Sequence, residues 1–129
     1  MRLVEEIADL QPGRSARGRR VTRPGDWYFQ GHFPGDPVVP AIVLIELLAQ
    51  TGGFAACSDA DGTVNPKALR VAAFGAFKFP GAARPGATLE AVARVVGRLG
   101  GLVKIEGEVT ADGVPVAIGG VTLAETPGT

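Results

Sequence analysis

The segment Ala41–Ser58 (AIVLIELLAQTGGFAACS) constrains the fold of this chain more than any other stretch. Its residues are apolar on almost every side, which is typical of a helix buried on most of its faces. Pro40 suits the first helical position, where its missing N–H costs nothing. We therefore expect a central helix over about residues 40–57, roughly 25 Å long at about 1.5 Å per residue. It does not fit a membrane span, because a carboxylate and a glycine pair interrupt it.

The second half of the chain is typical of β-strands. After a polar loop over Asp59–Lys67, apolar and β-branched residues recur with a two-residue period, and glycine-rich turns separate the runs. The Asp112-Gly113 pair is a strong hairpin signal. The expected strand regions are Leu69–Phe79, Thr88–Arg98, Leu102–Thr110 and Val114–Ala124. Antiparallel strands after one buried helix predict an α+β fold, with a sheet wrapped around the helix.

The N-terminal third is less regular. Residues 1–12 have apolar positions at helical spacing, which predicts a short amphipathic helix ended by Pro12-Gly13. The basic run Arg14–Arg20 is interpreted as a solvated loop or an edge strand, and alternatively as a docking patch for an acidic partner. The aromatic, Pro- and Gly-rich stretch Pro24–Pro40 is expected to be an ordered loop that packs aromatic rings on the core.

Length and composition set further limits. A chain of 129 residues predicts a single domain over residues 1–129. Its formal net charge of zero argues against a nucleic-acid-binding surface, which needs a basic excess. The one cysteine, Cys57, allows no intrachain disulfide and is expected to be a small packing residue. Acidic residues near Met1 do not fit a signal peptide, so we expect a cytoplasmic protein.

One carboxylate in the apolar helix is the first candidate for chemistry. An ionised Glu46 among apolar neighbours costs several kcal/mol, about the penalty of an unpaired buried charge. Between Arg23 and Lys67, His32 alone can carry positive charge, and it is the only histidine of the chain. Gln50 follows Glu46 by one helical turn, where its amide can hydrogen-bond the carboxylate or a bridging water. His32 and Glu46 are therefore a candidate acid–base pair.

The amino-acid sequence of this region resembles the signature motif of the bacterial 3-hydroxyacyl-acyl-carrier-protein dehydratases. The loop Gly31-His32-Phe33-Pro34-Gly35-Asp36-Pro37-Val38-Val39-Pro40 resembles the G-H-F-P-x-x-P-V/I-M-P pattern of that family. An acid follows the family histidine by fourteen residues, as Glu46 follows His32, and Gln50 stands where the family has Gln. The match is tight over about 25 residues.

The resemblance implies a hot-dog fold that works as a homodimer or a higher homo-oligomer, with the His and the acid of one site contributed by different subunits. It implies reversible removal of water from a 3-hydroxyacyl thioester on acyl carrier protein or CoA, in fatty-acid or polyketide-like biosynthesis.

The resemblance also implies residue roles. His32 suits the base that takes the α-proton, and Glu46 suits the acid or the group that holds a water. The N–H groups of Ala41 and Ile42 at the helix start would polarise the thioester carbonyl. The expected substrate-binding residues are Phe33, Val39, Pro40, Ala41, Ile42 and Gln50. No metal or organic cofactor is expected.

The sequence departs from the family pattern at four places. Ala41 replaces the usual Gly at the helix start, and Val39 the usual Met. The family's N-terminal P-H-R-x-P-F-L segment is not visible, and Pro80 stands where a basic residue commonly follows K-F. Lys78, Arg84 or the basic run Arg14–Arg20 would then serve for docking the carrier. Two alternatives therefore stay open: a catalytically silent acyl-thioester-binding subunit and a hot-dog thioesterase.

Overall fold

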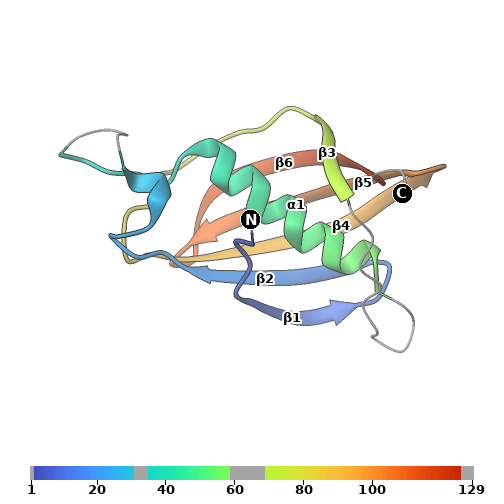
Figure 1. The fold of residues 1–129 in the computed structure, drawn as a ribbon, viewed down its shortest axis with the longest axis horizontal. Coiled ribbons are helices and arrows are strands. Elements are labelled where there is room, and N and C mark those ends of the chain that lie inside the picture. The colour runs from blue at the N-terminus through green and yellow to red at the C-terminus, as the bar shows by residue number, and fades with distance from the viewer. Residues whose placement is uncertain (1, 31–34, 59–68, 126–129) are drawn as a thin grey trace.

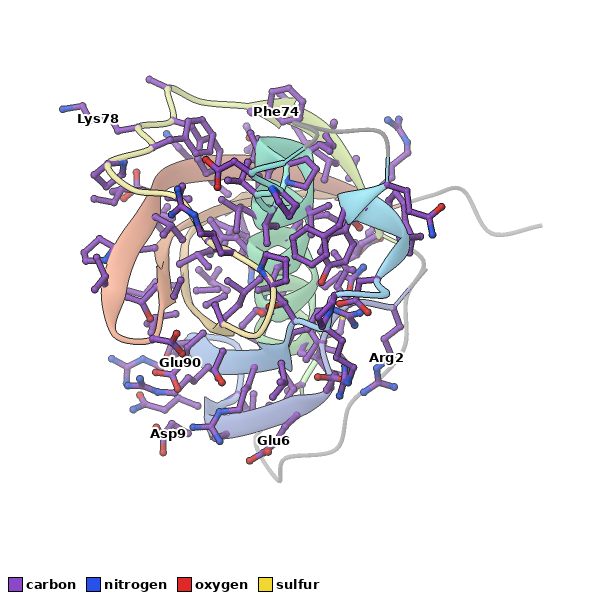
Figure 2. The ribbon with its side chains drawn as sticks, turned by 90° about the vertical axis from the view of Figure 1, so that its left-hand side faces the viewer. Arg2, Glu6, Asp9, Phe74, Lys78 and Glu90 are labelled. Atoms are coloured by element: carbon purple, nitrogen blue, oxygen red, sulfur yellow. The ribbon has the colours of Figure 1, made fainter. Side chains whose placement is uncertain are left out.

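A computed structural model describes residues 2–30, 35–58 and 69–125 (Figure 1). Strands β1 to β6 pair antiparallel in one sheet, in the order β1-β2-β4-β5-β6-β3. The helix α1 lies across one face of this sheet, which curls around it (Figures 1 and 2). In chain order the elements are β1 (Glu6–Gln11), β2 (Ser15–Val21), the 3-10 helix η1 (Trp27–Phe29), α1 (Ala41–Ala56), β3 (Leu69–Phe74), β4 (Thr88–Leu99), β5 (Leu102–Ala111) and β6 (Val114–Glu125).

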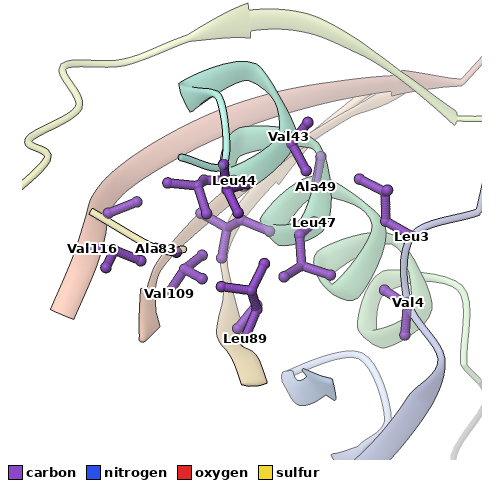
Figure 3. Packing of buried hydrophobic residues seen from close by; sticks show 14 of the residues in the cluster. Leu3, Val4, Val43, Leu44, Leu47, Ala49, Ala83, Leu89, Val109 and Val116 are labelled. Carbon is purple, nitrogen blue, oxygen red and sulfur yellow. The ribbon is translucent and has the colours of Figure 1, made fainter. Parts of the chain in front are cut away.

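The core lies between α1 and the concave face of the sheet (Figure 3). Leu47 and Leu48 of the helix have no exposed surface, and neither have Leu89, Ile105 and Val109 of the strands. Burying a side chain of this size contributes about 1.5–3 kcal/mol. The apolar run of the sequence is therefore explained by contact with strands on several sides, and the predicted sheet around a central helix is confirmed.

Two glycines let the helix come close to the sheet. A Cβ atom on Gly18 of β2 would lie 2.2 Å from the Thr51 hydroxyl oxygen, and one on Gly52 would lie 2.7 Å from the Ile105 side chain. Thr51 is fully buried and donates its hydroxyl hydrogen to the Leu47 carbonyl. The separation of α1 from β2 and β5 is therefore set by missing side chains.

The hairpin signal is confirmed. Asp112 and Gly113 link β5 to β6 with φ angles of 48° and 84°, the left-handed pair that a tight two-residue hairpin needs. The strand predicted over Leu69–Phe79 is shorter, since β3 ends at Phe74 and only a bridge between Lys78 and Ile118 follows. The predicted loop Asp59–Lys67 lies outside the described residues. In the stretch Pro24–Pro40, Tyr28 and Phe29 are buried as expected.

The N-terminal helix prediction is wrong. Residues 6–11 form β1, which pairs with β2, and residues 2–5 lead into it without regular structure. Periodicity favoured a helix, but pairing with β2 satisfies backbone groups that a helix this short would leave open at both ends. The left-handed Asp9 (φ 50°) and a register shift between Ala8 and Gln11 break the two-residue alternation that would have signalled a strand.

The basic run Arg14–Arg20 forms most of β2, which lies between β1 and β4 and is not an edge strand. Arg17 pairs with Glu90 and with Asp9, and Figure 2 shows both acids on the side of the sheet away from α1. Arg19 approaches Glu90 at 3.8 Å. The side chains that a partner would contact are therefore partly neutralised within the chain, and a docking patch there stays a prediction.

The helix begins and ends slightly inside its predicted bounds. Pro40 has an extended backbone (ψ 147°) and caps α1 from outside, whereas the prediction made it the first helical residue. The helix ends at Ala56, and Cys57 is half-buried at its C-terminal end. In the described part of the chain, no helix is long and apolar enough to cross a membrane.

Candidate active site

The candidate acid lies in the second turn of α1. Glu46 is half-buried between the fully buried Leu47 and the half-buried Ile45. One turn further on, Gln50 donates a hydrogen bond from its Nε2 to Glu46 Oε1 at 3.2 Å. The predicted contact between these two side chains is therefore present, because a spacing of four residues places them on one face of the helix.

The other end of the Gln50 amide binds the N-terminal segment. Its Oε1 accepts hydrogen bonds from the backbone N–H of Leu3 at 2.7 Å and of Val4 at 3.2 Å. The Leu3 and Val4 side chains are almost completely buried against the core (Figure 3). Residues 3 and 4 therefore contact the candidate site directly, which the sequence did not indicate.

The start of α1 is accessible. The Val43 and Leu44 N–H groups both bond to the Pro40 carbonyl, so the N–H groups of Ala41 and Ile42 have no acceptor within the helix. Ala41 is exposed, and residue Ile42 is 59% exposed. This helix end carries a partial positive charge and has no acidic residue in its first turn. The geometry suits an incoming carbonyl oxygen or another partly negative atom.

The segment before the helix is held in place from the loop after β3. The Val39 N–H donates to the Ala83 carbonyl at 2.8 Å, and Val39 is 5% exposed. Arg84 pairs with Asp36 at 3.1 Å on the surface. His32 and Phe33, the other predicted residues of the loop, lie outside the described residues. Their roles stay predictions.

A partly buried polar cluster precedes the His32 loop. The Tyr28 hydroxyl donates to Asp26 at 2.6 Å and accepts from Arg20 Nε at 3.1 Å, and Arg20 pairs with Asp26 at 3.3 Å. Burial and the bond to Asp26 raise the pKa of Tyr28 to about 12. Burial by itself would raise the pKa of Asp26, but hydrogen bonds from Tyr28 and the Arg23 N–H, with the charge of Arg20, hold it below its usual value.

One hollow in the described residues lies elsewhere. It has a volume of about 530 Å³ and is lined by the end of β3, the residues just after it and strands β4, β5 and β6. Phe74, Arg94, Lys104 and Ile118 are among its lining residues, and no predicted site residue is.

The helix α1 wrapped by the antiparallel sheet is the hot-dog fold. The chain belongs to the FabA-like family, because the family model of the FabA-like domain matches residues 1–119. The chain is similar to 3-hydroxyacyl-[acyl-carrier-protein] dehydratase FabZ of a Roseiflexus species, at 32% identity over 117 residues, covering 86% of this chain and 80% of that protein. The protein of the same name from Chloroflexus aggregans is 40% identical over 87 residues, covering 67% of this chain but only 59% of its own length.

Solved structures agree on the fold. The dehydratase heterocomplex ApeI:P from Xenorhabdus doucetiae matches with a TM-score of 0.69 and 18% identity, over 97% of this chain and 100% of that one. A thioesterase superfamily member from Thermus thermophilus matches with the same TM-score and identity, over 92% and 85%. The fold by itself therefore does not separate dehydration from thioester hydrolysis.

Proposed function

We propose that this protein is a hydro-lyase that reversibly removes water from a 3-hydroxyacyl thioester carried by acyl carrier protein, giving the trans-2-enoyl thioester in fatty-acid biosynthesis. The observation that carries the proposal is the family membership, with curated relatives named as such dehydratases. The position of Glu46 beside Gln50 supports it, because the helix holds a carboxyl group close to its own accessible N-terminal end.

The proposed chemistry needs three groups. His32 takes the proton from the carbon next to the thioester carbonyl, and Glu46 gives a proton to the departing hydroxyl, which leaves as water. The negative charge that develops on the carbonyl oxygen is stabilised by the N–H groups of Ala41 and Ile42. Ala41 keeps the N–H of the family glycine and adds one methyl group, which narrows the approach to it. Phe33, Val39 and Pro40 would contact the substrate beside this helix end.

We also propose that the site is shared between two copies of the chain, with His32 of one subunit facing Glu46 of the other. Strand β3 lies at one edge of the sheet, where Phe74 is 58% exposed, and Ile42 at the helix start is 59% exposed. Two exposed apolar side chains, and a strand edge with which no other described strand pairs, are features that a second copy would cover. We expect this dimer to work in the cytoplasm.

The test follows hydration of a crotonyl thioester by loss of the enoyl absorbance, on CoA and on acyl carrier protein. We expect activity in the wild type, loss in His32→Ala and Glu46→Gln, and full activity in the control Glu6→Gln, whose side chain is exposed on β1. A wild type silent on both substrates, though folded, would favour the acyl-binding subunit. Release of free thiol that stops with Glu46→Gln would favour the thioesterase.

Mixing the two inactive variants tests the shared site. After the chains are refolded together at equal amounts, half of the dimers contain one of each, and one of their two sites is intact. We expect about a quarter of the wild-type activity, from a two-fold-symmetric dimer with sites across its interface. If His32 and Glu46 of one site came from one chain, the mixture would stay inactive.

A further inference from the structure

We propose that the peptide group joining Leu3 to Val4 connects the candidate acid to the segment that leads into the His32 loop, and that Gln50 and Arg20 are positioning residues acting through it. The observation is that both sides of this one peptide are bound. Gln50 Oε1 accepts its N–H, which belongs to Val4, at 3.2 Å, and Arg20 Nη1 donates to its carbonyl, which belongs to Leu3, at 3.2 Å. The catalytic part of this inference rests on the proposed function.

The backbone fixes the orientation of the Gln50 amide. Two N–H donors, from Leu3 and Val4, converge on its Oε1 and use the acceptor capacity of that oxygen. The NH2 group must then face the other way, toward Glu46. Gln50 is therefore held as a donor to the carboxylate, and an amide turned by 180° would lose three hydrogen bonds at once.

Arg20 connects the Leu3 carbonyl to the 3-10 helix η1. Its guanidinium binds the Leu3 carbonyl, the Tyr28 hydroxyl and the Asp26 carboxylate. Tyr28 belongs to η1, whose last residue, Phe29, precedes His32 by three positions. An unbroken series of hydrogen bonds thus runs from Glu46 to the 3-10 helix in front of the histidine. In the proposed dimer, each chain gives Glu46 to one site and His32 to the other. This series of hydrogen bonds therefore connects the two sites within one chain.

Burial makes these contacts strong enough to position side chains. Leu3 and Val4 are 1% and 2% exposed, and the side chains of Arg20 and Asp26 are each 13% exposed. Hydrogen bonds of charged groups shielded from water are stronger than their exposed counterparts. The segment is also fastened beyond Leu3, where the Glu5 N–H donates to the Arg19 carbonyl at 2.8 Å. The N-terminal segment is therefore a fixed support for the site.

Two substitutions of Gln50 separate its functions. Gln50→Glu keeps an oxygen for the Leu3 and Val4 N–H groups but replaces the donor that faces Glu46. Gln50→Met has a similar length and removes both. We expect kcat to fall about tenfold to a hundredfold in both variants, the cost of a misplaced catalytic group, with KM changed less than threefold. Hydrogen exchange at the Leu3 and Val4 amides should stay slow in Gln50→Glu and become fast in Gln50→Met.

Arg20→Lys and Arg20→Met test the other half. Lysine keeps the charge but lacks the planar guanidinium that binds three acceptors, so both variants should lower kcat and speed exchange at the Leu3 and Val4 amides. The effect of Arg20→Met should be the larger. The double variant Gln50→Met/Arg20→Met should lose less than the product of the single losses in kcat, because both act through one peptide. Arg94→Met, which replaces an exposed arginine on β4, is the matched control and should change neither kcat nor exchange at the Leu3 and Val4 amides.

The outcomes separate this inference from the proposed function. A wild type inactive on both thioesters would refute the proposed function, and amide exchange in the folded variants would still decide the connection through Leu3. An active wild type with unchanged kcat in Gln50→Glu and Arg20→Met would overturn the inference. So would multiplicative losses in the double variant, or unchanged amide exchange in Gln50→Met and Arg20→Met.

Discussion

Gly18→Ala should destabilise the protein through a single contact between β2 and α1. The added Cβ would lie 2.2 Å from Thr51 Oγ1 and 3.2 Å from Thr51 Cβ and Cγ2. Thr51 is fully buried, branched at Cβ and bonded to the Leu47 carbonyl, so it cannot turn away without losing that bond. Forcing an extra methyl group into such a core costs about 1–3 kcal/mol in the free energy of unfolding.

Urea unfolding at fixed protein concentration measures this loss. With a slope of about 2 kcal/mol per M, a loss of about 2 kcal/mol moves the midpoint down by about 1 M. Thr51→Ala removes the Oγ1 and Cγ2 atoms that the new methyl group would meet. In a Thr51→Ala background, Gly18→Ala should therefore lower the free energy of unfolding by at least about 1 kcal/mol less than it does in the wild type. If the two losses in stability added within about 0.5 kcal/mol, the clash would not be the cause and the reasoning would be wrong. Because Thr51 follows Gln50, we also expect a lower kcat in Gly18→Ala, restored in part by Thr51→Ala.

Three further variants probe separate features. The raised pKa of Tyr28 means that its contribution to stability is complete below pH 10 and lost as the pH rises toward 12, so Tyr28→Phe should flatten the alkaline fall in the urea midpoint. Gly113→Ala puts a side chain at φ 84° and should cost about 1 kcal/mol by the same assay, whereas Gly113→Asn should cost less. Arg94→Met breaks an exposed pair with Glu108 and should cost about 0.2–1 kcal/mol, an effect that fades in high salt.

The local patterns predicted the elements that carry the fold. The buried helix, three of the four later strands and the Asp112-Gly113 hairpin follow from periodicity and turn chemistry, which act between residues close in the chain. The contact between Glu46 and Gln50 is equally local, because one helical turn separates them. The acid, its neighbouring amide and the helix start were therefore accessible from the sequence alone.

Tertiary structure decided the N-terminal third. Helical spacing in residues 1–12 was overridden because β2 offered a complete set of backbone partners to β1. The bond from Leu3 to Gln50 spans 47 residues, and that from Arg20 to the Leu3 carbonyl spans 17. No short pattern encodes such pairs, since they form only when the sheet curls around the helix and buries the segment. The sequence determined which groups could do chemistry, and the packing of distant segments decided what holds them.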